Sequence, residues 1–518
     1  MSKREQFVAA IQKSYQTSMP SIHLGSAILN GEIITEAQVN LPLRMMNRHG
    51  LVAGATGSGK TRTLQVLAEQ LSAAGVPVFM SDIKGDLSGI AQPGKSNTAI
   101  EERSKALGTV FEPSGYPVEL YSLSGLKGAQ MRATVLEFGP ILLSKIFELN
   151  DTQSGVLAIL FKYADDQDLP MVDLNDLKKV LSYLSEGPGA AEIKADYGSI
   201  SSSTAGTILR KIVALEQQGV GSIFGEKSFD ITDLINRVDG QGVISLLNIS
   251  DVQDKPALFS TFMLSLLAEL YQKLPEAGDL DKPKLVFFLD EAHLLFKDAP
   301  KAFLDQIEQV IRLIRSKGVG IFFCTQMAQD VPVTVLGQLG NRIQHVLRAF
   351  TPQDADALKQ TVKTYPRSAF YEIDQVLTTL GIGQALVTVL NEKGIPTEVA
   401  ATHLLPPTSI MGPMTQADYE SHVQQSDVYL KYKDPIDPQS AYEMLTKRME
   451  AHAKVEADAI EEKQQTKQQK EDPGMISEVL KSPLAKQIGR EVVRGVFGML
   501  FGKKTTSSRK KTGGFFGF

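Results

Sequence analysis

The chain has 518 residues, which is room for about two to four domains, and 42% of them are apolar, enough for a substantial buried core. The formal net charge of −5 at pH 7 excludes a uniformly basic protein that coats nucleic acid. This total hides an asymmetry, because residues 481–518 carry a local charge of +8 and the first 480 residues carry −13. We therefore expect the acidic body and the basic tail to have different tasks.

The sequence favours a soluble, cytoplasmic protein. Its one cysteine, Cys324, cannot form an intrachain disulfide, and no cluster of Cys and His has metal-ligand spacing. The N-terminus lacks the apolar segment of a secretory signal. No apolar run approaches the roughly 20 residues that a transmembrane helix needs. We therefore expect a reducing compartment, no structural zinc and no transmembrane segment.

Apolar runs of strand length alternate with helical patterns over most of the chain. A short β-ribbon is predicted first, at 22–28 and 32–39. The strands predicted after it are 51–53, 76–80, 118–122, 243–249, 285–289, 319–324 and 345–349. One helical face carries Leu64, Leu67, Ala68 and Leu71, and another carries Phe303, Ile307, Val310 and Ile314. Non-alternating strands separated by helices are typical of a buried, mostly parallel sheet in an α/β fold.

Residues 128–238 interrupt this alternation with helical patterns and predict an all-α insertion. A hairpin is expected at 384–390 and 397–401, followed by a Gln-, Lys- and Glu-rich segment that reads as a solvated helix or a disordered linker. The predicted organisation is an N-terminal ribbon (1–49), a first part of the core (50–127), the insertion (128–238), a second part of the core (239–407), a linker (408–480) and a flexible basic tail (481–518).

A glycine-rich motif carries the strongest chemical signal. It fits G-x-x-x-x-G-K-T, follows an apolar strand and precedes an amphipathic helix, as a P-loop does. Its small residues let backbone N–H groups and the helix N-terminus face a phosphate, Lys60 reaches the β- and γ-phosphates, and the Thr61 hydroxyl coordinates Mg²⁺. The predicted ATP-binding residues are Gly54, Ala55, Thr56, Gly57, Ser58, Gly59, Lys60 and Thr61.

Two further strands end in polar residues. The strand at 285–289 is followed by Asp290, which suits a Mg²⁺ site beside a P-loop, and by Glu291, which can activate water for attack on the γ-phosphate. Gln326 follows the strand at 319–324, where it could sense the γ-phosphate or hold the attacking water, or only satisfy the strand end. Cys324 reads as a small core residue.

Two arginines lie near the end of the helix between these strands. Arg312 and Arg315 suit the helix dipole and solvent, and an arginine finger offered to a neighbouring subunit is the alternative. The motif from Asp82 to Asp86 either shapes the site or forms a turn on Gly85. Both His49 and His293 read as structural.

Taken together, these motifs resemble the HerA–FtsK superfamily of RecA-like P-loop ATPases, and more closely the YjgR-type bacterial HerA-like proteins. The resemblance covers roughly residues 20–405 and rests on the P-loop, the acidic pair and Thr325-Gln326, together with the motifs at 82–86 and 315–320. It implies ATP and Mg²⁺ as cofactors, a hexameric homo-oligomer that hydrolyses ATP between subunits, and translocation on duplex DNA. By position, Arg315 matches the arginine finger, Gln326 the sensor glutamine and Glu291 the catalytic glutamate.

Two comparisons limit this resemblance. HerA carries an N-terminal β-barrel, whereas the P-loop here begins at residue 54, so ring stability and partner choice do not transfer directly. A DEAH-type helicase also combines such a P-loop with Asp-Glu-Ala-His. We reject that assignment, because 230 residues separate Lys60 from Asp290 and too little α/β sequence follows Gln326 for a second motor domain.

Two functions stay open at this stage. The first is a Mg²⁺-dependent ATPase that acts as a ring motor on DNA. The second is a slow, nucleotide-gated scaffold that recruits an unidentified protein partner, because a motor that threads duplex should present basic residues and the body is acidic. For the tail, binding to nucleic acid or anionic lipid, docking as an apolar peptide, and no ligand all remain open.

Overall fold

The computed structural model describes residues 2–252, 254–278, 280–297 and 301–468. The predicted tail at 481–518 and the end of the predicted linker lie outside this range. The chain divides into two compact units, Met1–Lys447 and Arg448–Phe518, and the features that follow belong to the first. Within the described ranges, no helix combines the length and the hydropathy required to span a bilayer.

A 12-stranded sheet forms the centre of the first unit, in the order β2-β1-β14-β13-β12-β3-β11-β10-β4-β9-β5-β6. From β12 to β6 neighbouring strands are parallel, and from β12 to β2 they are antiparallel. The strands are β1 (Ser21–Leu29), β2 (Glu32–Pro42), β3 (Gly50–Ala53), β4 (Val78–Asp82), β5 (Val118–Ser122), β6 (Ala129–Gln130), β9 (Ile244–Asn248), β10 (Leu285–Leu289), β11 (Val319–Thr325), β12 (Asn341–Gln344), β13 (Gln384–Thr388) and β14 (Ala400–Leu404). The predicted α/β fold with a mostly parallel sheet is confirmed.

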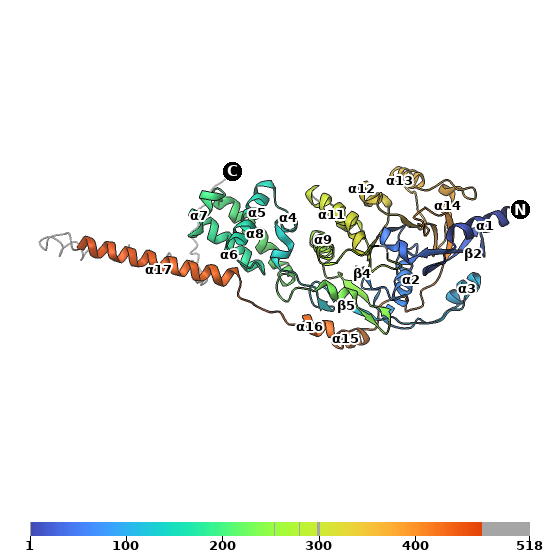
Figure 1. Cartoon of the computed structure of the whole chain (residues 1–518), viewed down its shortest axis with the longest axis horizontal. Helices are drawn as coiled ribbons and strands as arrows, with labels where there is room; N and C mark the ends of the chain where they lie inside the picture. Colours follow the sequence, from blue (N-terminus) through green and yellow to red (C-terminus); the bar gives the residue numbers. More distant parts are fainter. Residues whose placement is uncertain (1, 253, 279, 298–300, 469–518) are drawn as a thin grey trace, which may run out of the picture. The chain divides into compact units, whose positions relative to one another are not determined.

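Helices cover this sheet and build the insertion (Figure 1). The helices of the described residues are α1 (Lys3–Tyr15), α2 (Lys60–Ala73), α3 (Thr98–Leu107), α4 (Val135–Ile146), α5 (Asp151–Asp166), α6 (Leu174–Ser185), α7 (Gly189–Asp196), α8 (Ser202–Gln217), α9 (Pro256–Lys273), α10 (His293–Phe296), α11 (Lys301–Ile314), α12 (Val333–Leu336), α13 (Pro352–Lys363), α14 (Ile373–Thr379), α15 (Gln416–Gln424), α16 (Asp427–Tyr432) and α17 (Ala441–Gln468), the last of which continues into the second unit. The predicted insertion contains α4 to α8, together with the short strand β6 and a two-residue strand, β7 (Arg237–Val238), that pairs with β8 (Gln241–Gly242).

Burial explains why the central strands show no alternation. Every residue of β3, β4, β9, β10 and β11 is buried, because helices cover both faces of the parallel part of the sheet. The predicted faces of α2 and α11 are buried as well. Each fully buried Leu, Ile or Phe contributes about 1.5–3 kcal/mol, so each of these two helix faces stabilises the fold by several kcal/mol.

The N-terminal ribbon does not stand apart from the sheet, because β1 pairs with β14 and so joins the antiparallel edge. Helix α1 covers this edge and was missed in the sequence. Ser2 and Glu5 form a capping box, and Phe7, Ile11 and Tyr15 are buried at helical spacing. The capping box and the helical spacing of these residues are both visible in the sequence. We did not assign a helix there because the segment is short and precedes the first predicted strand. The domain boundaries at 49, 127, 238, 407 and 480 remain predictions.

One predicted strand was wrong. The strand assigned to 345–349 lies four residues earlier, at β12. Two polar side chains in β12, Asn341 and Gln344, are buried and hid the apolar pattern. The Asn341 amide donates to the backbone oxygens of Met45 and His49, both at 2.9 Å, so its burial is compensated. Beyond Gln344 the pairing ends, because β3 stops at Ala53 and the chain curls into the glycine-rich motif.

The beginning of the predicted linker is folded onto the unit. The Tyr419 hydroxyl of α15 donates to the Lys127 oxygen at 2.7 Å, and the Nε2 atom of His422 lies 2.8 Å from the Val118 oxygen. Further along, the Tyr432 hydroxyl of α16 donates to Asp233 at 2.6 Å. Residues 415–432 therefore bridge the β5 edge of the sheet and the end of the insertion.

Candidate nucleotide site

The glycine-rich motif lies between β3 and α2, as the sequence predicted. Gly54, Gly57 and Gly59 have φ angles of 149°, 77° and 106°, which other residues adopt only with strain. At Gly54 the requirement is also steric, because a Cβ atom there would lie 2.5 Å from the Cβ of His345. The loop can therefore curl tightly beneath α2.

The first residues of α2 face this loop. Lys60 lies over it, and its Nζ atom donates to the oxygens of Gly54 at 2.7 Å and Ala55 at 3.2 Å. Gly59 is the N-cap and supplies no side chain to the helix start. Backbone N–H groups at this end thus carry a partial positive charge without a side-chain acceptor, the arrangement that suits a phosphate.

The acidic pair follows β10, which is separated from β3 by β11 alone. The backbone N–H of Asp290 donates to the Ser81 hydroxyl at 2.9 Å, and the Asp290 Oδ1 atom accepts from the Glu291 N–H at 2.9 Å. Glu291 has a φ of 48°, an unusual conformation for a non-glycine residue and one that often marks functional sites. Its Oε2 atom lies 3.3 Å from the Nδ1 atom of His293 and is buried without a hydrogen bond among the described residues.

The predicted lysine and acids meet around the end of β11. Burial raises the pKa of the Cys324 thiol, the carboxylates of Asp290 and Glu291 raise it further, and the Lys60 ammonium opposes this effect. Cys324 itself is fully buried, as predicted. Because β3, β11 and β10 are parallel neighbours, the P-loop that follows β3 and the acidic pair that follows β10 lie at the same edge of the sheet.

Gln326 follows β11 at this edge and is exposed. It lines a pocket of about 490 Å³ together with His293, Phe296 and Lys297. The strand order β3-β11-β10 therefore sets the glycine-rich motif, Gln326 and the acidic pair side by side. His293, which we assigned no chemical role, lies beside both Glu291 and the Gln326 pocket.

At the end of β4, Asp82 organises a turn. Its carboxylate accepts from the backbone N–H groups of Gly85 at 2.7 Å, Asp86 at 3.2 Å and Leu87 at 3.0 Å, and burial raises its pKa to about 6. Asp86 in turn lies 3.7 Å from the Arg62 guanidinium of α2. Of the two alternatives for this motif, the geometry favours a turn, and the turn is tied to the helix that carries Lys60.

The structure does not bring Arg315 into this site. Arg315 precedes β11, whereas Gln326 follows it, and seven strand residues at about 3.3 Å each separate the two by roughly 20 Å. At that opposite end, Arg315 is exposed and lines a pocket of about 380 Å³ with Arg44, Arg48 and Arg312. Within this chain, Arg315 is therefore at the edge of the sheet opposite the glycine-rich motif.

The sequence of this chain matches one protein family over most of its length. The family is described as helicase HerA-like C-terminal, and its model matches residues 28–506. The chain belongs to this family. This assignment agrees with the resemblance drawn from the motifs, and with the rejection of a DEAH-type helicase.

Curated relatives of this HerA-like chain are distant. The DNA double-strand break repair helicase HerA of Sulfolobus acidocaldarius is 22% identical over 381 residues, which cover 69% of this chain and 66% of that protein. The DNA import protein CedB of the same organism is 23% identical over 386 residues, which cover 74% and 56% of the two chains. The HerA-like chain thus spans less than two thirds of these relatives' own length.

Solved structures show weaker similarity. The plasmid coupling protein TrwB, in complex with the non-hydrolysable GTP analogue GDPNP, matches with a TM-score of 0.48 at 12% identity, over 77% of this chain and 98% of that one. VirB4 of Thermoanaerobacter pseudethanolicus matches with a TM-score of 0.45 at 13% identity, over 75% and 98%. The family assignment does not depend on these two similarities.

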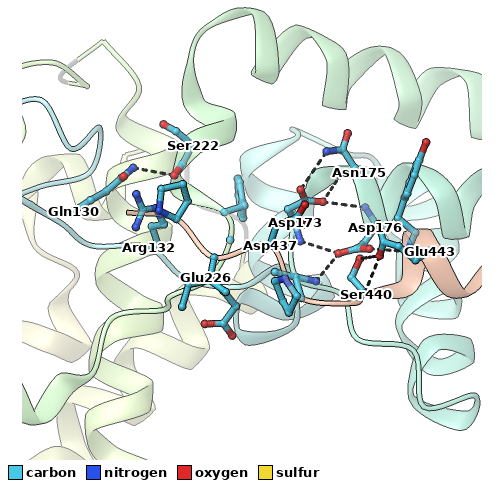
Figure 2. Close-up of a pocket in the computed structure, with 17 residues that line it drawn as sticks. Gln130, Arg132, Asp173, Asn175, Asp176, Ser222, Glu226, Asp437, Ser440 and Glu443 are labelled. Carbon is cyan, nitrogen blue, oxygen red and sulfur yellow. Dashed lines mark hydrogen bonds between the residues drawn. The ribbon is translucent and has the colours of Figure 1, made fainter. Parts of the chain in front are cut away.

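A larger pocket of the HerA-like chain lies elsewhere, between the insertion and residues 435–443 (Figure 2). Its volume is about 610 Å³, and none of the predicted site residues lines it. Two of its carboxylates have structural partners: Asp173 caps α6, and Asp176 accepts from the N–H groups of Val172, Asp173 and Tyr442. Arg132 donates to the Tyr432 oxygen at 2.7 Å. Several polar groups of this pocket therefore hold residues 432–443 against the insertion.

Sequence reasoning missed His345 and the loop 381–383, which contact the glycine-rich motif from the β12 side. The Nε2 atom of His345 lies 3.0 Å from the Thr63 hydroxyl of α2, and the Gly383 N–H donates to the Ser58 oxygen at 3.1 Å. No local pattern marks either contact, because 282 and 325 residues separate the partners along the chain. A histidine directly after a buried strand beside a P-loop was the one available hint.

Proposed function

We propose that this protein is a Mg²⁺-dependent ATP hydrolase that works as an oligomeric ring motor on DNA. The observation that carries the proposal is the convergence of the Lys60 ammonium, Asp290 and Glu291 at the end of β11, directly beside the glycine-rich motif. Phosphoryl transfer depends on positioning and on neutralising charge, and this arrangement supplies both. The names of HerA and CedB point to DNA as the substrate of relatives, and that is the reason to propose it here.

Each residue would have a distinct role. The motif Gly54–Thr61 would hold the phosphates, with Lys60 moving from its backbone acceptors to the β- and γ-phosphates. Glu291 would orient and deprotonate the attacking water, because its Oε2 atom is a buried acceptor without a hydrogen bond among the described residues, at the edge of the sheet where the glycine-rich motif lies. Gln326, exposed beside it, would contact the γ-phosphate or the same water.

The residues present fit Mg²⁺ better than a soft metal. Thr61 in the first turn of α2 and Asp290 offer hard oxygen ligands, and Mg²⁺ takes its other ligands from water and phosphate. Among the described residues, no group of three or more His, Cys, Asp and Glu side chains could hold a metal ion by itself, and a nucleotide-bound Mg²⁺ does not need one. Once bound, the ion would neutralise charge on the β- and γ-phosphates.

The position of Arg315 supports an oligomer if Arg315 acts as an arginine finger. Its guanidinium lies at the edge of the sheet opposite the glycine-rich motif, so a contact with ATP requires a neighbouring subunit. Ring closure by repeated head-to-tail contacts satisfies this requirement, and a hexamer is the ring size that the resemblance implies.

The second candidate is a slow ATPase scaffold that recruits a protein partner. Its support is the charge of −13 over the first 480 residues, together with the bridge that residues 415–432 make between the sheet and the insertion. A motor that encloses duplex should gain affinity as salt is lowered, because counterions are released from DNA. The affinity of a scaffold for duplex DNA should not rise in this way.

Steady-state ATPase activity tests the enzymatic proposal. Lys60→Ala should abolish nucleotide binding or turnover, whereas Glu291→Gln should bind ATP and fail to hydrolyse it. Unchanged turnover in both purified variants would rule the proposal out. Duplex DNA then separates the two candidates: salt-sensitive stimulation of the wild-type rate supports the motor, and no stimulation at low salt supports the scaffold.

A further inference from the structure

The loop of residues 381–383 lies against the glycine-rich motif. The Gly383 N–H donates to the Ser58 oxygen at 3.1 Å, and a Cβ atom on Gly59 would lie only 3.2 Å from the Gly383 nitrogen. This loop leads into β13, which is antiparallel to β12, so it lies at the same sheet edge as the motif. Any nucleotide whose phosphates occupy the motif therefore has this loop as a neighbour.

Between the two glycines, Ile382 is 72% exposed. Exposure of a large aliphatic side chain at one position is common and by itself means little. What distinguishes Ile382 is that its backbone is fixed. Arg103 of α3 donates through Nη1 to the oxygens of Gly383 at 3.1 Å and Leu404 at 3.0 Å, and through Nη2 to the Ile382 oxygen at 3.0 Å.

Arg103 has no competing use among the described contacts. Its guanidinium donates to three carbonyl oxygens, and burial lowers its pKa. The ring of His403 beside it has a pKa lowered to about 4 by burial and by the Arg103 charge, so it is neutral at physiological pH. The loop therefore holds an apolar side chain in a constant position, with no titrating group that would displace it.

The sheet order fixes the direction in which a nucleotide would extend. Lys60, Asp290 and Glu291 meet on the β11 and β10 side of β3, which is where the terminal phosphate reacts. The nucleoside must therefore extend from the phosphates away from β10 and β11. The loop 381–383 flanks the glycine-rich motif on that other side of β3, next to β12 and β13.

We propose that Ile382 is the apolar platform on which the base of the bound nucleotide packs. The flat face of a nucleobase and an exposed aliphatic side chain both lose unfavourable contact with water when they meet. The backbone oxygens of residues 382 and 383 already accept from Arg103, so the contribution proposed for the loop is the apolar surface of Ile382. This inference rests on the proposed nucleotide site and adds the recognition of the nucleoside to it.

The test compares a ligand with a base to one without. Binding of Mg·ADP and of inorganic tripolyphosphate is measured by calorimetry for the wild-type chain and for Ile382→Ser. The variant should bind ADP about tenfold more weakly, because the side chain's contact area is lost, while its affinity for tripolyphosphate stays the same. Ile382→Leu should restore ADP affinity.

Ile395→Ser is the matched control. Ile395 is 55% exposed in the turn at the other end of the β13–β14 hairpin, so its substitution should alter neither affinity. Equal ADP affinity in Ile382→Ser and wild type would overturn the inference, and so would an equal loss for ADP and tripolyphosphate, which indicates a displaced phosphate loop. If the wild-type chain binds tripolyphosphate and the nucleoside adds no affinity, the inference about Ile382 is overturned, but the proposed phosphate site is not. Failure of the wild-type chain to bind either ligand would instead overturn the proposed nucleotide site itself.

Discussion

The Nε2 atom of His345 lies 3.0 Å from the Oγ1 atom of Thr63, which joins the residue after β12 to the first turn of α2. The Thr63 hydroxyl also reaches the Gly59 oxygen at 3.3 Å, so His345 supports the glycine-rich motif through the helix that follows it. The imidazole is buried, and its Nδ1 atom has no hydrogen-bond partner within the described part of the chain. The charged form of the ring is therefore disfavoured in the folded chain.

Burial and the nearby Lys60 charge lower the pKa of His345 from 6.5 to about 4. Between these values the unfolded chain binds the proton more readily than the folded one, so the stability contributed by the neutral ring is complete above pH 6.5 and is lost as the pH falls towards 4. The whole effect is at most about 3 kcal/mol. Thermal midpoints at pH 7.5 and 5 should differ less for His345→Gln than for the wild type. Parallel pH dependences of the two proteins would contradict this assignment.

Glu69 ties α2 to the segment that follows the sheet. Its carboxylate is 2% exposed and accepts from the N–H of Thr408 at 2.8 Å, the hydroxyl of Thr408 at 2.9 Å, and the N–H of Ser409 at 3.2 Å, with a further hydrogen bond from the Ser409 hydroxyl. Glu69→Ala leaves these donors without an acceptor and should cost about 3 kcal/mol. The apparent thermal midpoint should fall by roughly a few degrees, whereas Glu102→Ala, at an exposed position of α3, should leave it within error.

Arg315 is predicted to act on the ATP of a neighbouring subunit. Arg315→Ala should retain nucleotide binding and lose turnover by at least a factor of about 10³. Mixing Arg315→Ala with Lys60→Ala should restore part of the activity, because one intact P-loop can then meet an intact Arg315. The double variant mixed with Lys60→Ala cannot form such a pair and is the negative control. No recovery in oligomers shown to contain both chains would exclude action between subunits.

Gly54 is predicted to be irreplaceable for steric reasons. In Gly54→Ala the new Cβ atom would lie 2.5 Å from the Cβ of His345, and the φ of 149° would be strained as well. The loop must then shift, so nucleotide affinity should fall by more than about tenfold. Gly108→Ala, at a φ of 68° where the nearest atom is 3.7 Å away, isolates the conformational cost of about 1–2 kcal/mol. ADP binding by calorimetry distinguishes them: only Gly54→Ala should lose affinity.

The glycine-rich motif, the acidic pair and the central strands were predictable because their signals are local. Three glycines before Lys60-Thr61 specify a loop that only a few φ angles allow, and strands such as β5 and β10 are bounded in the structure as the sequence predicted. The strand β12 was misplaced because Asn341 and Gln344 are buried although they are polar; Asn341 donates to the distant Met45 oxygen, and Gln344 donates to the backbone oxygen of its neighbour His345. Polar residues are usually expected at the surface, so the sequence pattern does not reveal the hydrogen bonds that allow these two to be buried.

By itself, then, the sequence determined the fold class, the P-loop and its family, since these depend on runs of neighbouring residues. Tertiary structure decided which distant residues meet. It separated Arg315 from the site that its motif resembles, because the two ends of β11 face opposite edges of the sheet. It brought His345 and the loop with Ile382 to the glycine-rich motif, because strand order, and not chain order, sets the neighbours of β3. Contacts of this kind are fixed by the packing of the whole sheet, and no local pattern of residues encodes them.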